Sequence, residues 1–97
     1  MRDDRPVEVQ VEALGARRFR VRVHDGAGET AHEVTVPRRL EGGPDLDDED
    51  LEHVVRESFH FLLRHEAASS ILTRFSLDDI TRYFPEYPDE LSRRLGT

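Results

Sequence analysis

The sequence predicts an α+β fold: a three-stranded antiparallel β-meander followed by one long helix and two or three short C-terminal helices. Residues 7–36 alternate apolar and polar side chains as strands do, and from residue 48 the apolar positions recur at helical spacing. The 97 residues are the size of one small domain. We expect a flexible N-terminus at residues 1–5, a linker loop at 38–46 and a helical half at 48–95.

The first two strands are predicted over residues 7–14 and 18–24, each with one face in a core. A one-residue slip would set apolar side chains against polar ones, so the pattern selects a register. That register requires a three-residue loop, 15–17, in which Gly15 supplies a positive φ. The predicted pairs are Val9 with Val23 and Val11 with Val21 inside, and Gln10 with Arg22 and Glu12 with Arg20 outside.

A third strand is predicted over about residues 30–36, after a glycine-containing turn at 26–29. Pro37 ends it, because proline cannot donate a hydrogen bond to a neighbouring strand. The expected pairs are Val21 with Val34 and Phe19 with Val36, with Glu33 beside Arg22 on the outer face.

The long helix is predicted over about residues 48–66, with Asp47 as N-cap and further acidic residues in the first turn. Its apolar positions span an arc of roughly 200°, broader than one amphipathic stripe requires. We therefore expect the helix to be covered by the sheet on one side and by the aromatic-rich segment 70–88 on the other. The apolar positions are Leu51, Val54, Val55, Phe59, Phe61, Leu62 and Leu63.

The C-terminal segment shows clear helix signals. Ser76 is expected to cap a helix, with Asp79 in the reciprocal position of a capping box. The predicted elements are a short turn over 71–74 capped by Ser70, a helix over 77–84, and a last helix from Pro88 to Gly96. The predicted core positions here are Leu77, Ile80, Phe84, Leu91 and Leu95.

Two tyrosines in this segment, Tyr83 and Tyr87, are candidate partner-binding residues. Tyrosine is frequent where one end of a side chain is dry and its hydroxyl is wet, as at interfaces and at the edge of a core. Both interpretations, core edge and partner contact, stay open at this point.

The outer face of the second strand carries the other candidate, a stripe of arginines that can bind phosphate or nucleic acid: Arg18, Arg20 and Arg22. Three observations oppose this interpretation. The net charge is −7, acidic residues are expected beside the stripe, and no aromatic residue interleaves with it for base stacking. A helix-turn-helix is disfavoured too, because its recognition helix would open with Asp78 and Asp79.

The long helix places His53, Glu57 and His60 at metal-ligand spacing. We predict no metal there, because this face is expected to point to water. A calcium loop in the acidic run fails where Asp50 replaces the required glycine and Arg56 the required glutamate. The chain has no cysteine, and no recognisable catalytic motif occurs, so no enzyme activity and no cofactor are predicted.

Residues 58–87 read SFHFLLRHEAASSILTRFSLDDITRYFPEY. They resemble a pattern in a family of small uncharacterised bacterial proteins, with an FLL helix, a SIL turn, a capped helix preceded by phenylalanine and a terminal YFPEY. The resemblance covers about a third of the chain and implies a domain that recurs in bacteria. It implies no activity and assigns no residue a catalytic role.

The function these observations favour is a non-catalytic protein-interaction or regulatory module. Its partner is another protein or a second copy, bound through the tyrosine region or the open sheet edge at residues 7–14. The alternative is nucleic-acid or phosphate binding through the arginine stripe. No apolar run is long enough to cross a bilayer and no secretory signal is recognised, so a cytoplasmic location is expected.

Overall fold

A computed structural model describes residues 7–26, 28–40, 42–43, 45–46 and 50–96. The predicted flexible terminus, 1–5, lies outside these residues. The α+β class is confirmed. In chain order the elements are β1 (Glu8–Gly15), β2 (Arg18–His24), β3 (Glu29–Thr35), α1 (Leu51–His65), a short 3₁₀ turn η1 (Ala68–Ser70), β4 (Arg74–Ser76), α2 (Leu77–Tyr83) and α3 (Tyr87–Arg94).

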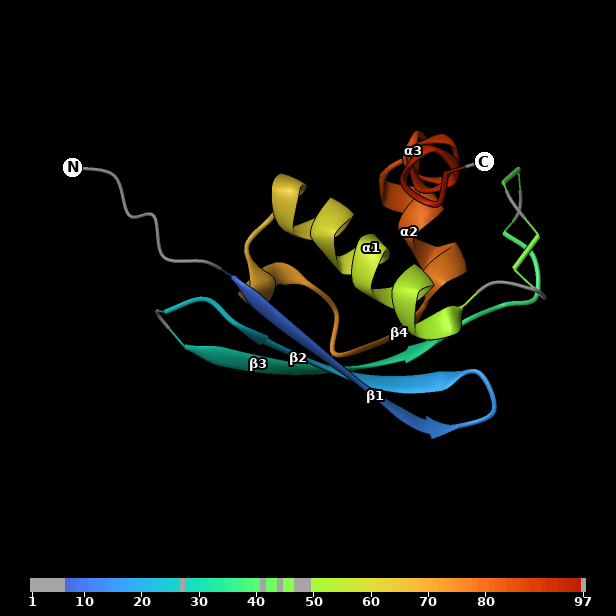
Figure 1. The fold of residues 1–97 in the computed structure, drawn as a ribbon. Coiled ribbons are helices and arrows are strands. Elements are labelled where there is room, and N and C mark those ends of the chain that lie inside the picture. Colours follow the sequence, from blue (N-terminus) through green and yellow to red (C-terminus); the bar gives the residue numbers. More distant parts are fainter. Residues whose placement is uncertain (1–6, 27, 41, 44, 47–49, 97) are drawn as a thin grey trace.

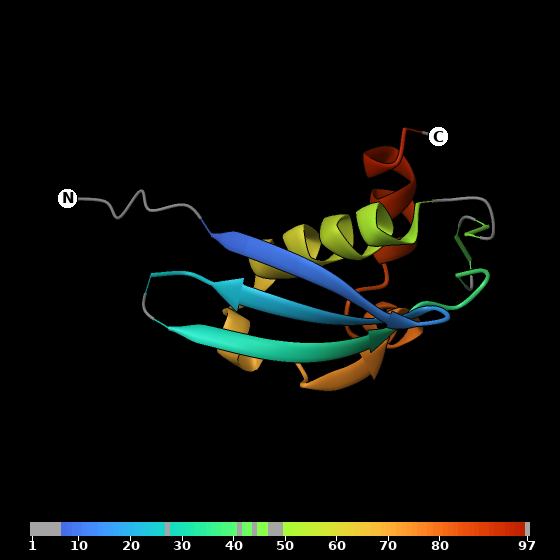
Figure 2. The same ribbon diagram turned by 60° about the horizontal axis from the view of Figure 1, so that its bottom comes forward.

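The strands form one mixed sheet with the order β1-β2-β3-β4. Figure 1 shows α1 lying along one face of this sheet, with α2 and α3 on the same side. Figure 2 shows the strands in front and the helices behind them. The described residues therefore form two layers, and none of their helices lies on the outer face of the sheet.

The predicted register of β1 and β2 is confirmed, including Val9 opposite Val23 and Glu12 opposite Arg20. The turn differs from the prediction, because Gly15 pairs with Arg18 and the register shifts between Ala13 and Gly15. The positive φ falls on Arg17, at 59°, and not on Gly15. The Arg17 guanidinium compensates by donating hydrogen bonds to the carbonyls of Val36 and Pro37, at 2.9 and 2.8 Å.

The predicted register of β2 and β3 was wrong by two residues. Phe19 lies opposite Val34, and Val21 lies opposite His32. The turn is shorter than expected because the Gly28 amide donates to the Asp25 carboxylate at 3.1 Å and Gly26 has a φ of 86°. A shift of two residues keeps each side chain on its predicted face, so His32 stays on the inner face with Val34, where it is buried.

The fourth strand was not predicted. Residues 74–76 pair in parallel with residues 33–35 of β3. The short turn predicted over 71–74 with Ser70 as its cap was wrong, because the 3₁₀ turn lies at Ala68–Ser70 and Ala67 is its N-cap. The Glu33 amide donates to the Thr73 carbonyl at 2.7 Å where the two segments meet. Three residues cannot show the alternation that identifies a strand. Instead, β4 forms because the chain comes back to the edge of β3 after α1 and pairs with it in parallel.

Helix α1 begins at Leu51 and has Asp50 as its N-cap, so the predicted cap at Asp47 was wrong. Residues 47–49 lie outside the described residues. The Asp50 carboxylate accepts from the amides of Glu52 and His53, at 3.1 and 3.4 Å. This arrangement places the cap directly before the first apolar residue of the helix.

Two groups of aromatic rings show that α1 is covered on two sides, as predicted. On the sheet side, the ring of Phe59 lies 5.4 Å from that of His32 and 6.0 Å from that of Phe75. On the other side, the ring of Phe61 lies 5.7 Å from that of Phe84 and 5.2 Å from that of Tyr87. These contacts join both halves of the chain to one helix.

The C-terminal helices follow their predicted signals closely. Ser76 and Asp79 form the capping box of α2, and Gly96 has the positive φ, 83°, expected just beyond α3. Leu77, Ile80 and Leu91 are buried, as predicted, whereas Phe84 and Leu95 are partly buried against the core. Among the described residues, no helix has the length and apolarity to span a bilayer.

Tyr87 is fully buried between α3 and α1. The Ser58 hydroxyl donates to the Val54 carbonyl at 2.8 Å, so the Tyr87 hydroxyl donates to Ser58, at 2.6 Å. Burial raises the pKa of Tyr87 well above its usual range, an effect that the hydrogen bond with Ser58 opposes and the charge of Asp78 reinforces.

We predict that Tyr87 makes the fold sensitive to alkali. Its folded-state pKa lies above its unfolded value of about 10, so its contribution to stability is complete below that pH and decreases as the pH rises further. The chain has two tyrosines and neither lysine nor cysteine, so few other side chains titrate in this window. The measurement is urea unfolding at neutral pH and above about pH 10.

Tyr87→Phe should lower the free energy of unfolding at neutral pH by about 0.5–1.5 kcal/mol through the lost hydrogen bond. It should also reduce the further loss in alkali. Tyr83→Phe is the matched control, because Tyr83 is 67% exposed. Its free energy of unfolding at neutral pH and the loss of that free energy in alkali should both match those of the unsubstituted chain. An alkaline loss of stability that persists unchanged in Tyr87→Phe contradicts the prediction.

Candidate functional site

The arginine stripe lies on the outer face of β2, as predicted, but two of its members each lie beside a carboxylate. Arg20 lies 3.6 Å from the Glu12 carboxylate, and Arg18 lies 3.9 Å from that of Glu33. The predicted pairing of Arg22 with Glu33 was wrong, because Arg22 lies opposite Gln10 and Ala31. Positive and negative side chains therefore lie side by side along the stripe, and it does not form a continuous positive surface.

The two candidate tyrosines lie in very different surroundings. Tyr83 is 67% exposed at the end of α2, whereas Tyr87 has no exposed surface. Tyr83 can contact a partner without rearrangement of the fold. The Tyr87 ring is instead packed against Phe61 and serves the core.

The helix face with His53, Glu57 and His60 contacts α3 through its middle residue. The Glu57 carboxylate lies 3.3 Å from the Arg94 guanidinium and 3.6 Å from His60 Nδ1. Glu57 is only 19% exposed, so it is a helix-to-helix contact and not a fully solvated residue. Within the described part of the chain, no three His, Asp or Glu side chains come together as a metal site.

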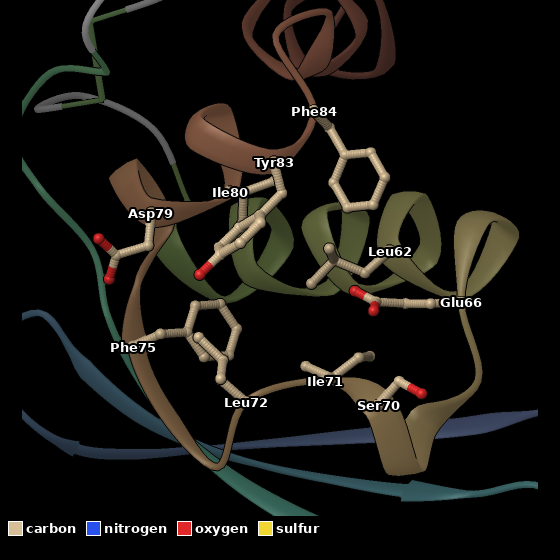
Figure 3. Close-up of a pocket in the computed structure, with 10 residues that line it drawn as sticks. All are labelled: Leu62, Glu66, Ser70, Ile71, Leu72, Phe75, Asp79, Ile80, Tyr83 and Phe84. Atoms are coloured by element: carbon tan, nitrogen blue, oxygen red, sulfur yellow. The ribbon is translucent and has the colours of Figure 1, made fainter.

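The feature that stands out is a groove, which sequence reasoning did not predict as such. It has a volume of about 230 Å³ and lies between the C-terminal half of α1, the segment after η1, and α2 (Figure 3). We call it the Leu72–Tyr83 groove. Its lining residues are Leu62, Glu66, Ser70, Ile71, Leu72, Phe75, Asp79, Ile80, Tyr83 and Phe84.

The floor and the rim of the groove differ in burial. Leu62, Ile71, Phe75 and Ile80 are buried and form an apolar floor. Leu72 and Tyr83 are 51% and 67% exposed on the rim, where they are two of the three large apolar side chains exposed among the described residues. The third, Val7, precedes β1. Such a concave apolar surface can receive an apolar side chain of a ligand.

Two carboxylates line the groove. Asp79 accepts from the Ser76 amide at 3.0 Å and lies 4.0 Å from the Arg82 guanidinium, so the capping box holds it in place. Figure 3 shows the Glu66 side chain extending from the end of α1 across the groove, between Leu62 and Ile71. Glu66 is the C-cap of α1 and is partly buried.

The buried His32 holds the rim segment against the sheet. Its Nδ1 lies 2.8 Å from the Leu72 carbonyl, which can only accept, so this nitrogen carries the proton. In the neutral ring, Nε2 then accepts from the Thr30 hydroxyl, at 2.9 Å. The position of Leu72 on the rim thus depends on a residue of β3.

Sequence reasoning missed His32, Glu66 and Leu72, although two of them carried a signal. His32 shares the parity of Val34 and so belongs on the inner face of its strand. Leu72 follows the apolar Ile71 in an extended segment, where successive side chains point in opposite directions. One of the two must therefore face away from the core. Nothing local to Glu66 indicates that it faces a groove.

Comparison with family models, curated proteins and solved structures found no match to this chain. The assignment of function therefore depends on the geometry of the surface.

We predict that His32→Phe destabilises the rim of the groove. Phenylalanine retains the ring that packs against Phe59 but leaves the Leu72 carbonyl and the Thr30 hydroxyl without this partner. The free energy of unfolding should fall by about 1–3 kcal/mol. Amide hydrogen exchange should accelerate at Glu33, whose amide binds the Thr73 carbonyl. Equal stability and unchanged exchange would show that the histidine does not hold this segment.

Proposed function

We propose that the chain is a non-catalytic protein-interaction module whose binding surface is the Leu72–Tyr83 groove. The observation that carries the proposal is a coincidence of position: the two most exposed large apolar side chains among the described residues lie on the rim of an apolar groove. Exposed apolar side chains that gather at a concavity are typical of protein-binding sites.

The construction of the groove supports this proposal. Its floor belongs to the hydrophobic core, its α2 wall is fixed by the capping box, and its other wall is tied to β3 through His32. Binding to a surface that is already formed requires little ordering of the protein, so more of the contact energy contributes to affinity. The proposal extends the sequence-based expectation for Tyr83 and excludes the Tyr87 side chain from direct contact. It also agrees with a recurring domain of bacterial proteins and with a location in the cytoplasm, both of which we infer from sequence.

Nucleic-acid or phosphate binding by Arg18, Arg20 and Arg22 has less support. Two of the three guanidinium groups lie within 4 Å of carboxylates, and these pairs reduce the positive potential available to a phosphate. We expect no binding of RNA or DNA in a fluorescence titration at low salt, where phosphate contacts are strongest.

A homodimer through the free edge of β1 is the other partner arrangement. The Arg56 guanidinium already donates to the Val9 carbonyl of this strand. A strand from a second copy would compete with Arg56 for that carbonyl. We therefore favour the groove over the edge, and sedimentation over a range of concentrations measures whether the chain self-associates.

The test is affinity capture from the native host with a double variant, Leu72→Ser with Tyr83→Ala. Both side chains are exposed, so the free energy of unfolding should change by no more than about 0.5 kcal/mol for each. A partner captured by the unsubstituted chain should be lost with this variant. Loss reflects removal of apolar contact area at the rim.

Val7→Ser is the matched control, because Val7 is 46% exposed and lies outside the groove. It should capture the same partner as the unsubstituted chain. Capture that is equal in all three proteins would exclude the groove as the binding surface.

A further inference from the structure

The Glu66 carboxylate is the most informative group in the Leu72–Tyr83 groove. It extends over the apolar floor (Figure 3), and among the described residues it makes neither an ion pair nor a side-chain hydrogen bond. The carboxylates of Glu57, Asp79 and Glu90 each lie within 4 Å of an arginine. Glu66 thus differs from these three carboxylates, because it lines the groove with acceptor oxygens that pair with no arginine in the described part of the chain.

Any ligand that fills the groove comes into contact with the Glu66 carboxylate. An apolar side chain placed over Leu62 and Ile71 would remove water from Glu66, and taking a charge out of water without a partner is unfavourable. A ligand that brings its own cation avoids that cost and gains a charge-assisted hydrogen bond. The groove therefore discriminates between ligands by charge.

The size of the groove indicates what kind of ligand this is. Its volume of about 230 Å³ is below the roughly 300–1,000 Å³ typical of small-molecule pockets. A side chain of a bound polypeptide needs less space than a free small molecule, because the rest of the polypeptide remains at the rim. Leu72 and Tyr83 provide apolar contacts for those flanking residues.

We propose that the groove binds a basic segment of a partner protein, which inserts a large apolar side chain over the floor and pairs an adjacent arginine or lysine with Glu66. This inference rests on the proposed function and adds the chemistry of the partner. A second copy of this chain fits less well, since two copies that each carry a net charge of −7 repel one another.

The experiment uses a random peptide library displayed on phage and selected against the full chain. Selected peptides should contain an apolar residue beside arginine or lysine. A synthetic peptide of the selected sequence should shift the NMR signals of Ile71, Leu72 and Tyr83. Replacing its basic residue by glutamine should weaken binding by roughly three- to tenfold.

Glu66→Gln provides the matching change on the protein. It should lower the affinity for the basic peptide by the same roughly three- to tenfold factor. It should have little further effect on the affinity for the glutamine-containing peptide. Glu86→Gln is the control, because Glu86 is an exposed glutamate outside the groove, and it should leave the affinity within about twofold.

Two distinct results would overturn the proposals. Peptides that shift the groove signals but lack a basic residue, or that bind Glu66→Gln equally well, would refute the basic partner and leave the interaction module standing. Selection that yields no peptide with groove shifts would refute both proposals.

Discussion

Helix α1 carries apolar side chains over too wide an arc for one partner layer, and the rest of the molecule is arranged around covering both of its flanks. The sheet covers one flank through His32 and Phe75, which lie beside Phe59. The C-terminal helices cover the other through Phe84 and Tyr87, which lie beside Phe61. With only 36% hydrophobic residues in the chain, a single helix that serves two interfaces builds one continuous core from few side chains.

The groove is a consequence of this arrangement. After α1 and η1 the chain runs through residues 71–76 to the sheet edge, where it adds β4, and it then returns to the helical layer as α2 and covers the second flank of α1. The return leaves the end of α1 open between Ile71 and Ile80, where the floor remains apolar. The binding surface that we propose is thus the part of the core that the fold does not close, and the backbone of its rim is held at Leu72 by a hydrogen bond with a residue of β3.

Much of this fold can be predicted from the sequence, since its local signals are strong. Alternating valines identify β1 and β2 and fix their register, and Ser76 with Asp79 identifies the start of α2. What failed depends on distant contacts. The turn before β3 is shorter than predicted, and the register between β2 and β3 therefore differs by two residues. Strand β4 forms only because residues 74–76 pair with the edge of β3. For the site, the sequence identifies Tyr83 as a tyrosine at the core edge or in a partner contact. Glu66 could not be identified, because the groove that it lines forms only when α2 packs beside α1.

The parallel pairing of β3 with β4 joins residues that lie about forty positions apart in the chain, Val34 with Phe75. During synthesis the hairpin of β1 and β2 can form early, because its contacts are local. The sheet cannot be completed until the ribosome has made Ser76, and α1 must wait still longer for Tyr87. A nascent chain arrested between these points would expose the apolar flank of α1, and exposed apolar surface of this kind makes a folding intermediate prone to aggregation.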